Sequence, residues 1–294
     1  MASPAAAGAE AGAGASANNI LRRFMERSRP RPSFFIERGA DNKLYEVKNP
    51  SDATWKFPDG TLFLDYIASH RVEREPIGRG GFGFAFLLTF GENHYVLKRI
   101  YKPGAKGRRE IVNLAELDGS PFVLYLLAGA VFSDYAYILS PYVPGARLDD
   151  WLDTHPGKED RIRVYNQLLE GLEYIHSKGF VHRDVKPQNI WVPDDISKPA
   201  FYLDFGTSVR IGEKNTFSGT EHYMPYGKLG RLGIQTPELN YFSLGIIFEE
   251  DPVPDGVFEV NLRRFNNIKA NTLKGKRFSR KGRKSRQNKN HYSN

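Results

Sequence analysis

The residues best suited to chemistry stand close together in the window His182-Arg183-Asp184-Val185-Lys186-Pro187-Gln188-Asn189. Asp184 is a carboxylate that can accept a proton, Lys186 carries a positive charge, and Asn189 offers an oxygen ligand to a metal ion. Transfer of a phosphoryl group needs an oriented hydroxyl, an acceptor for its proton and neutralisation of phosphate charge. The window therefore indicates phosphoryl-transfer chemistry.

A second acidic candidate begins the triplet Asp204-Phe205-Gly206, which follows the apolar run Phe201-Tyr202-Leu203. Such a triplet alone is common by chance. Its position about 20 residues beyond Asp184 makes it a specific signal. A carboxylate there suits a magnesium ion that also binds phosphate oxygens.

A glycine-rich segment lies upstream, at Gly78-Arg79-Gly80-Gly81-Phe82-Gly83. Before a helix, this pattern would indicate a dinucleotide-binding fold. Here it precedes two strand-like runs, Phe84–Phe90 and Tyr95–Ile100, which the turn Gly91-Glu92-Asn93 separates. We therefore expect a hairpin that covers phosphates.

Lys98 lies within the second strand-like run, where it is suited to contact phosphate. The next segment, Arg108 to Leu117, has the apolar spacing of a helix. Glu110 on this helix is the expected ion-pair partner of Lys98, because it has the better spacing to Leu114. Glu116 is the alternative partner.

Taken in order, these features resemble the eukaryotic protein kinase superfamily over about residues 72–250. The resemblance implies that the chain binds ATP and Mg²⁺ and transfers the γ-phosphoryl group to a protein hydroxyl. The catalytic residues that it implies are Asp184, Lys186, Lys98 and Glu110. The magnesium ligands that it implies are Asn189 and Asp204.

The catalytic window resembles the serine/threonine form of the family, because Pro187 follows Lys186. Residues Gly219-Thr220-Glu221-His222-Tyr223-Met224 resemble the substrate-docking end of an activation segment, in which Thr220 would brace Asp184 and Lys186. A weaker resemblance, carried by Asn189-Ile190-Trp191 and residues 243–249, is to kinases that act on translation initiation factor 2.

The adenine pocket that the resemblance implies differs from the usual one in its side chains. The roof residue is Ala85 instead of valine, and Val96 replaces the usual alanine, so the summed volume is about conserved. Trp191 would form the floor. The hinge would be Pro141-Tyr142-Val143, with Ser140 as a small residue at the back. The complete set of expected ATP-binding residues is Gly78, Arg79, Gly80, Gly81, Phe82, Gly83, Ala85, Val96, Lys98, Ser140, Tyr142, Val143 and Trp191.

The fold class implied is α+β, with a small β-rich N-lobe, a shortened and mostly helical C-lobe, and a cleft between them. We expect five segments along the chain. They are a disordered Ala/Gly then Arg-rich arm (1–30), an N-terminal extension of unassigned role (31–71), the N-lobe and hinge (72–143), a truncated C-lobe (144–255) and a basic, disordered tail (256–294).

Three departures from the family pattern favour an alternative function. Pro225-Tyr226-Gly227 stands where an A-P-E motif is expected, Asn240 replaces an aspartate, and few residues follow Glu250. The alternative is a catalytically weak or inactive kinase-like decoy that binds other proteins. Shortened kinases of this sort are often virus-encoded or otherwise divergent.

Composition restricts the other classes. The 294 residues contain no cysteine, which excludes disulfides, a thiol nucleophile and cysteine-ligated metal. No signal peptide or membrane-spanning run is found, so we expect a cytoplasmic or nuclear protein. The formal net charge is +8, and residues 260–294 contain no acidic side chain. That tail is either a solvated segment or a binding site for a polyanion or a nuclear import receptor.

The resemblance also suggests a regulatory site. Arg183 precedes Asp184, and in kinases with this arginine a phosphate on the activation segment commonly pairs with it. Thr216 is the first candidate for that phosphate and Ser218 the second. The alternative is that both are ordinary loop hydroxyls.

Overall fold

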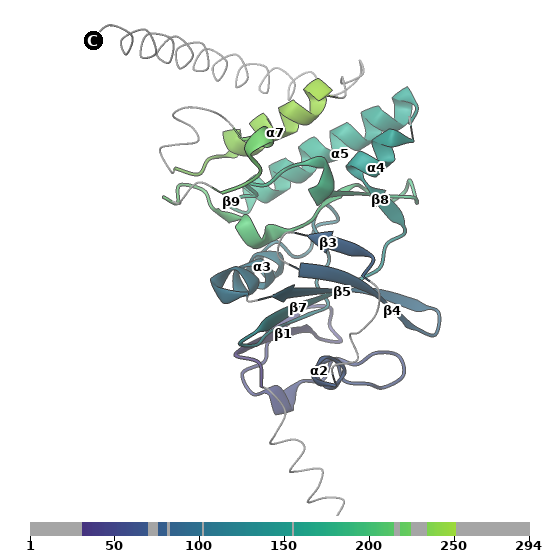
Figure 1. Cartoon of the computed structure of the whole chain (residues 1–294), viewed down its shortest axis with the longest axis vertical. Coiled ribbons are helices and arrows are strands. Elements are labelled where there is room, and N and C mark those ends of the chain that lie inside the picture. The colour runs from purple at the N-terminus through teal and green to yellow at the C-terminus, as the bar shows by residue number, and fades with distance from the viewer. Residues whose placement is uncertain are drawn as a thin grey trace, which may run out of the picture.

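The computed structural model describes residues 31–69, 76–80, 83–101, 103–154, 156–214, 218–224 and 234–250. Several expectations lie outside these ranges: those for Gly81, Phe82 and Thr216, for the arm 1–30 and for the tail 256–294. Within them the chain forms a sheet-rich part and a helical part, stacked one on the other along the long axis (Figure 1). This is the α+β, two-lobed arrangement expected from the sequence.

The sheet-rich part contains a seven-stranded sheet in which every neighbouring pair is antiparallel. The hairpin predicted around Gly91 is present, and Gly91 has a φ of 62°, which suits a residue without a Cβ. In spatial order the strands are β2 (Leu44–Glu46), β1 (Phe34–Arg38), β6 (Ala128–Val131), β7 (Tyr135–Pro141), β5 (Asn93–Tyr101), β4 (Gly83–Phe90) and β3 (Gly78–Gly80).

The N-terminal extension (residues 31–71) is part of this sheet. Its strand β1 pairs with β6, with Phe34 opposite Val131, and so places β1 and β2 at the sheet edge. A short 3₁₀ helix η1 (Pro50–Asp52) and helix α2 (Phe63–Ala68) follow. Aromatic rings of the extension pack with Phe90 and Tyr95 of the β4–β5 hairpin, including Phe57, which stacks on Phe90 with 4.0 Å between ring centroids.

Helix α3 (Gly104–Glu116) lies beside the sheet and begins a turn earlier than its apolar pattern predicts, directly after Pro103. The strand β6 that follows the helix covers only Ala128–Val131. Residues 122–127 cross from the helix to the sheet, and the N–H of Leu124 donates to the carbonyl of Tyr202 in the other lobe.

The helical part is built on α5 (Lys158–Ser177), whose apolar face is buried, including Tyr165, Leu168 and Leu172. None of the helices in the described ranges is both long and apolar enough to cross a membrane. The remaining elements of this part are β8 (Gly145–Arg147), α4 (Leu148–Asp153), β9 (Phe180–Val181), η2 (Pro187–Asn189), β10 (Ile190–Pro193), β11 (Phe201–Tyr202), η3 (Phe205–Thr207), β12 (Val209–Arg210), η4 (Glu221–Tyr223) and α7 (Pro237–Glu250).

Candidate active site

A pocket of about 820 Å³ lies between the two parts and contains most of the predicted site residues. Strands β3, β4 and β5 form one wall, and η2, β10 and the segment around Asp204 form the other. Its lining includes ten of the expected ATP-binding residues, which are Gly78, Arg79, Gly83, Ala85, Val96, Lys98, Ser140, Tyr142, Val143 and Trp191. Gly80 pairs with Gly83 in the adjoining β3–β4 hairpin.

One end of the pocket holds a charge cluster in which Glu110 is buried and Lys98 and Asp204 are partly exposed. Lys98 Nζ lies 2.6 Å from Glu110 Oε1 and 3.4 Å from Asp204 Oδ1. Burial raises the pKa of Glu110 to about 7, although Lys98 opposes that shift. Burial alone would lower the pKa of Lys98, but the carboxylates of Glu110 and Asp204 outweigh it and the pKa is raised. These three residues therefore form one coupled group.

Glu116, the alternative partner for Lys98, points elsewhere. Its carboxylate pairs with the guanidinium of Arg210 in β12, at a site where both side chains are about half exposed. Of the two carboxylates, Glu110 is the one that forms the ion pair with Lys98.

A second polar cluster surrounds Asp184. Thr220 donates its hydroxyl to Asp184 Oδ1 at 2.7 Å, and Lys186 Nζ lies 3.0 Å from Asp184 Oδ2. Lys186 Nζ also donates to the Thr220 hydroxyl at 2.8 Å, so the three side chains form a closed triangle. Asn189 Nδ2 donates to Asp184 Oδ2 and to its backbone carbonyl, both at 2.9 Å. The Asp184 carboxylate is thus fixed from several sides.

The backbone around the two aspartates is left-handed, with φ of 73° at Arg183 and 59° at Asp204. Such conformations are uncommon for residues other than glycine and persist only where the surroundings hold them. At Arg183 the holding group is Asn240 of α7, whose Oδ1 accepts the Arg183 N–H at 3.0 Å. Asn240 is fully buried, and its Nδ2 lies 3.0 Å from His176 Nε2. The departure noted at Asn240 therefore retains a hydrogen-bond acceptor without burying a charge.

Helix α3 is tied to the segment that follows Asp204. Asn113 donates its amide to the carbonyls of Phe205 and Ser208, both at 3.0 Å, in a buried setting. The spacing of apolar residues gave no signal for this contact, because an isolated asparagine on a helix most often faces solvent.

His182 lies at the junction of the two aspartate loops. Its ring lies 4.7 Å from that of Phe205, centroid to centroid, and its Nε2 is 2.8 Å from the carbonyl of Leu203. Burial lowers its pKa, so the imidazole is neutral at pH 7, with the Nε2 hydrogen donated to that carbonyl. Leu114 and Leu126 are also buried, in the same apolar cluster as Phe205.

The opposite end of the pocket is the expected adenine site. Trp191 Nε1 donates to the carbonyl of Val143 at 3.0 Å, and the N–H of Tyr142 donates to the carbonyl of His94 at 3.0 Å. Two of the hinge groups thus have protein partners. Ser140 is 2% exposed and small, and it lines the back of the pocket.

The side-chain oxygens of Asp204 and Asn189 are of the kind that magnesium prefers. Asp204 presents a carboxylate whose pKa is lowered overall: burial alone would raise it, but the positive charge of Lys98 outweighs that effect. Asn189 uses its amide nitrogen on Asp184, which leaves the amide oxygen as its acceptor group. Mg²⁺ is commonly held by one or two such protein oxygens together with phosphate oxygens and water.

Comparison with known proteins gives one family. The model of the protein kinase domain matches residues 71–289. The interferon-induced, double-stranded RNA-activated protein kinase of Rattus norvegicus is 30% identical over 233 residues, covering 69% of this chain and 44% of its own. The protein of the same name in Mus musculus is 31% identical over 265 residues, covering 80% of this chain and 50% of its own.

A probable serine/threonine-protein kinase of Encephalitozoon cuniculi is 30% identical over 196 residues, covering 63% of this chain and 60% of its own. The chain thus spans about half the length of these curated relatives. The family match covers most of the sequence, and the fold and the pocket agree with it. The chain belongs to the protein kinase family.

Proposed function

We propose that this chain is an active protein kinase that uses ATP and Mg²⁺ to phosphorylate serine and threonine hydroxyls of proteins. The observation that carries the proposal is that two polar clusters meet at the same pocket, whose lining includes Lys98, Glu110 and Asp204 of one cluster and Lys186 and Thr220 of the other. The Lys98–Glu110–Asp204 cluster is suited to phosphate and metal, and the Asp184–Lys186–Thr220 triangle is suited to the accepting hydroxyl.

In this proposal the residues divide the reaction between them. Asp184 orients the hydroxyl and accepts its proton, since each carboxylate oxygen can take more than one hydrogen bond. Lys186 and Lys98 neutralise the phosphate oxygens, and Glu110 keeps Lys98 in place. Asp204 and Asn189 would hold Mg²⁺, which offsets the charge of the β- and γ-phosphates when it is bound.

The preference for serine and threonine rests on the sequence Lys186-Pro187 and on the position of Thr220. The Thr220 hydroxyl joins Asp184 to Lys186 beside the site that the substrate hydroxyl would reach. A relative whose name includes serine/threonine-protein kinase supports the same class.

The competing proposal is a catalytically inactive decoy that binds other proteins. It was favoured by the replacement of aspartate by Asn240, yet Asn240 still accepts the Arg183 N–H. A decoy has no use for paired phosphate and hydroxyl clusters, so the active enzyme explains more of the site.

The test is transfer of radiolabelled phosphate from γ-labelled ATP to a generic protein substrate, followed by phosphoamino-acid analysis. The wild-type chain should label serine and threonine in a magnesium-dependent way, and Asp184→Asn should not. Label in phosphotyrosine would refute the substrate class, and no transfer by correctly folded, ATP-binding protein would favour the decoy. Translation initiation factor 2 as substrate tests the weaker resemblance noted in the sequence.

We further propose that a phosphate on Thr216 or Ser218 pairs with Arg183 and orders the activation segment. Burial lowers the pKa of Arg183, and the nearby positive charge of Arg109 lowers it further, while Glu213 opposes both effects. Two guanidinium groups therefore lie close together at this site. A phosphate would bring close to two negative charges. Peptide mapping of active protein should find it at one of the two positions. Undiminished activity in the Thr216→Ala, Ser218→Ala double variant would refute the idea.

The basic tail is proposed to bind a polyanion or a nuclear import receptor and not to take part in catalysis. Deletion of residues 274–294, which are dense in Lys and Arg, should leave the transfer rate unchanged. It should weaken heparin binding or change the location of the protein in cells. Loss of transfer in the deletion variant would show instead that this segment belongs to the catalytic domain.

A further inference from the structure

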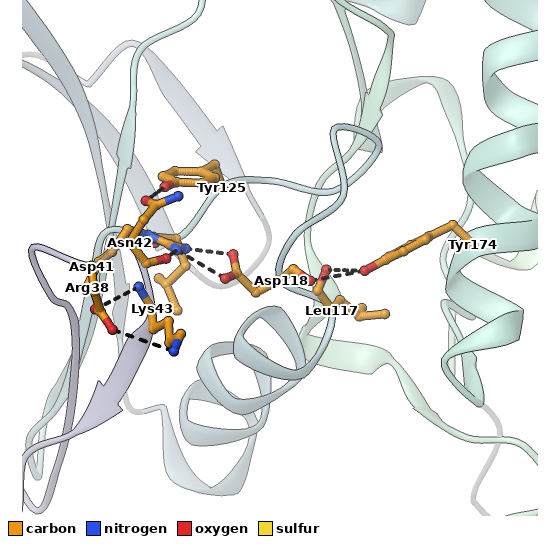
Figure 2. Close-up of polar contacts among 9 residues, drawn as sticks. Arg38, Asp41, Asn42, Lys43, Leu117, Asp118, Tyr125 and Tyr174 are labelled. Atoms are coloured by element: carbon orange, nitrogen blue, oxygen red, sulfur yellow. Dashed lines mark hydrogen bonds and ion pairs between the residues drawn. The ribbon is translucent and has the colours of Figure 1, made fainter.

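Arg38, the last residue of β1, is buried in spite of its charge, with 5% of its side chain exposed. Its two terminal nitrogens form a fork on Asp118, with Nη2–Oδ1 at 2.6 Å and Nη1–Oδ2 at 3.1 Å. Nε and Nη2 also donate to the carbonyl of Leu126, and Nη1 to that of Asn42. Figure 2 shows this arrangement, in which every guanidinium nitrogen has a partner.

The turn of the extension helps to hold this guanidinium. The Arg38 guanidinium lies 4.0 Å from the ring centroid of Tyr125, and the Tyr125 hydroxyl donates to the side chain of Asn42. Asn42 has a left-handed φ of 64°, which directs the β1–β2 turn back toward Arg38. The extension and the segment after α3 are therefore joined by a polar network around the buried Arg38 and not by apolar contact alone.

The Arg38 guanidinium pairs with a residue just beyond the end of α3. Asp118 follows the helix by two residues, and the helix carries Glu110. The same short segment is held from the other lobe by Tyr174 of α5, whose hydroxyl donates to the carbonyls of Leu117 and Asp118 at 3.2 and 3.1 Å. As Figure 2 shows, Arg38 and Tyr174 reach this segment from opposite sides.

The position of this anchor bears on the charge cluster. Glu110 and Asp118 are eight residues apart, which is about 12 Å along a helix. A tilt of α3 by about 10° around its anchored end would displace Glu110 by about 2 Å over that length. The Lys98–Glu110 contact is 2.6 Å, so a displacement of this size would break it.

We propose that Arg38 is a positioning residue for phosphoryl transfer: the N-terminal extension supplies a built-in anchor that holds α3 with Glu110 against Lys98. The inference rests on the proposed kinase function for its rate measurements. It assigns a role to the extension, for which the sequence offered none.

The test compares Arg38→Met, which removes the charge and keeps the stem, with Arg38→Lys, which keeps the charge and loses the fork. Arg163→Met is the matched control, because Arg163 pairs at 3.2 Å with exposed Asp160 on α5, away from α3. For each protein, kcat and KM for ATP are measured well below the melting temperature, and hydrogen exchange is followed in peptides that span residues 104–117.

Arg38→Met should lower kcat/KM about tenfold and speed exchange in α3, Arg38→Lys should fall between, and Arg163→Met should match wild type. Asp118→Asn should resemble Arg38→Met, and the double variant should be no worse than Arg38→Met alone. Arg38→Lys, which keeps the charge, and Asp118→Asn, which keeps the size and shape of the side chain, keep the test open if Arg38→Met does not fold.

Two outcomes would overturn the inference. One is a lower melting temperature with kcat/KM and α3 exchange unchanged, which would make Arg38 purely structural. The other is faster exchange without loss of rate. If wild-type protein transfers no phosphate, the proposed function fails separately, and unchanged exchange in the Arg38 variants would still refute the anchor.

Discussion

Helix α3 carries two glutamates whose surroundings differ sharply. Glu110 has 3% of its side chain exposed and pairs with Lys98, whereas Glu116 is 43% exposed and pairs with Arg210. Six residues on a helix place them on different faces. Loss of one partner of a buried charge pair strongly destabilises the folded protein, whereas an exposed pair contributes about 0–1 kcal/mol to its stability. The same residue type on the same helix therefore has an expected catalytic role in one case and a minor role in the other.

The largest effect that this comparison predicts is at the partner of the buried glutamate. Lys98→Met should lower the transfer rate about 100-fold or more, because it removes the charge beside the phosphates. The fold should persist at reduced stability, since Lys98 lies on the pocket wall and outside the apolar core, and Glu110, whose pKa burial already raises to about 7, can take up a proton when its partner is lost. Rate assays with circular dichroism as the folding control check this. Turnover near the wild-type level would contradict the role assigned to the Lys98–Glu110 pair.

A second, smaller difference should separate the two aspartates of the pocket. In the proposed division of roles Asp204 holds the metal and Asp184 the hydroxyl, so Asp204→Asn should weaken MgATP binding about tenfold and Asp184→Asn should change it little. Calorimetry with and without magnesium measures both. Equal affinities in the two variants would contradict this division of roles.

The raised pKa of Glu110 predicts a pH signature in the stability of the protein. The folded-state pKa is about 7, above the usual 4.5, so the folded protein binds this proton more tightly than the unfolded chain does. The stabilisation is full below pH 4.5 and is lost as the pH rises through about 7. The Glu110→Gln variant should therefore gain stability relative to wild type as the pH rises across that window.

Denaturant unfolding of both proteins at several pH values between 4.5 and 8 tests this, with Glu116→Gln as the control. A difference between wild type and Glu110→Gln that does not change with pH would show that Glu110 keeps an ordinary pKa.

The smallest expected effect is at the exposed Glu116–Arg210 pair. Glu116→Gln should lower the free energy of unfolding by no more than about 1 kcal/mol, and added salt should remove the difference. Urea titrations at low and high salt provide the measurement. A loss of stability several times larger would show that the Glu116–Arg210 pair also anchors α3.

The sequence was most informative where function fixes spacing. Asn189 and Asp204 line one pocket, and Asp184 is hydrogen-bonded to Asn189. They could be grouped from the sequence because their residue types and separations suit a phosphate and metal site, and their roles remain predictions. The β4–β5 hairpin could be predicted from Gly91, since the turn is local. The sequence does not show directly which side chains are buried: Glu110 and Glu116 are the same residue type on one helix.

Long-range pairing was beyond sequence reasoning. Strand β1 pairs with β6, about a hundred residues away, and no local pattern specifies that partner. Nothing in the sequence therefore distinguishes Arg38, and Asn240 is only a departure from the family pattern, although it accepts a hydrogen bond from the Arg183 N–H. Both contacts depend on residues that only the folded chain brings together.

The most direct test of the account is a side-by-side measurement of initial transfer rates for Glu110→Gln and Glu116→Gln at pH 8 and saturating MgATP. The two variants make the same chemical change on the same helix, so they differ only in location. The account predicts a rate for Glu110→Gln about tenfold or more below that of Glu116→Gln, which should stay within about twofold of wild type. Equal rates in the two variants would contradict it.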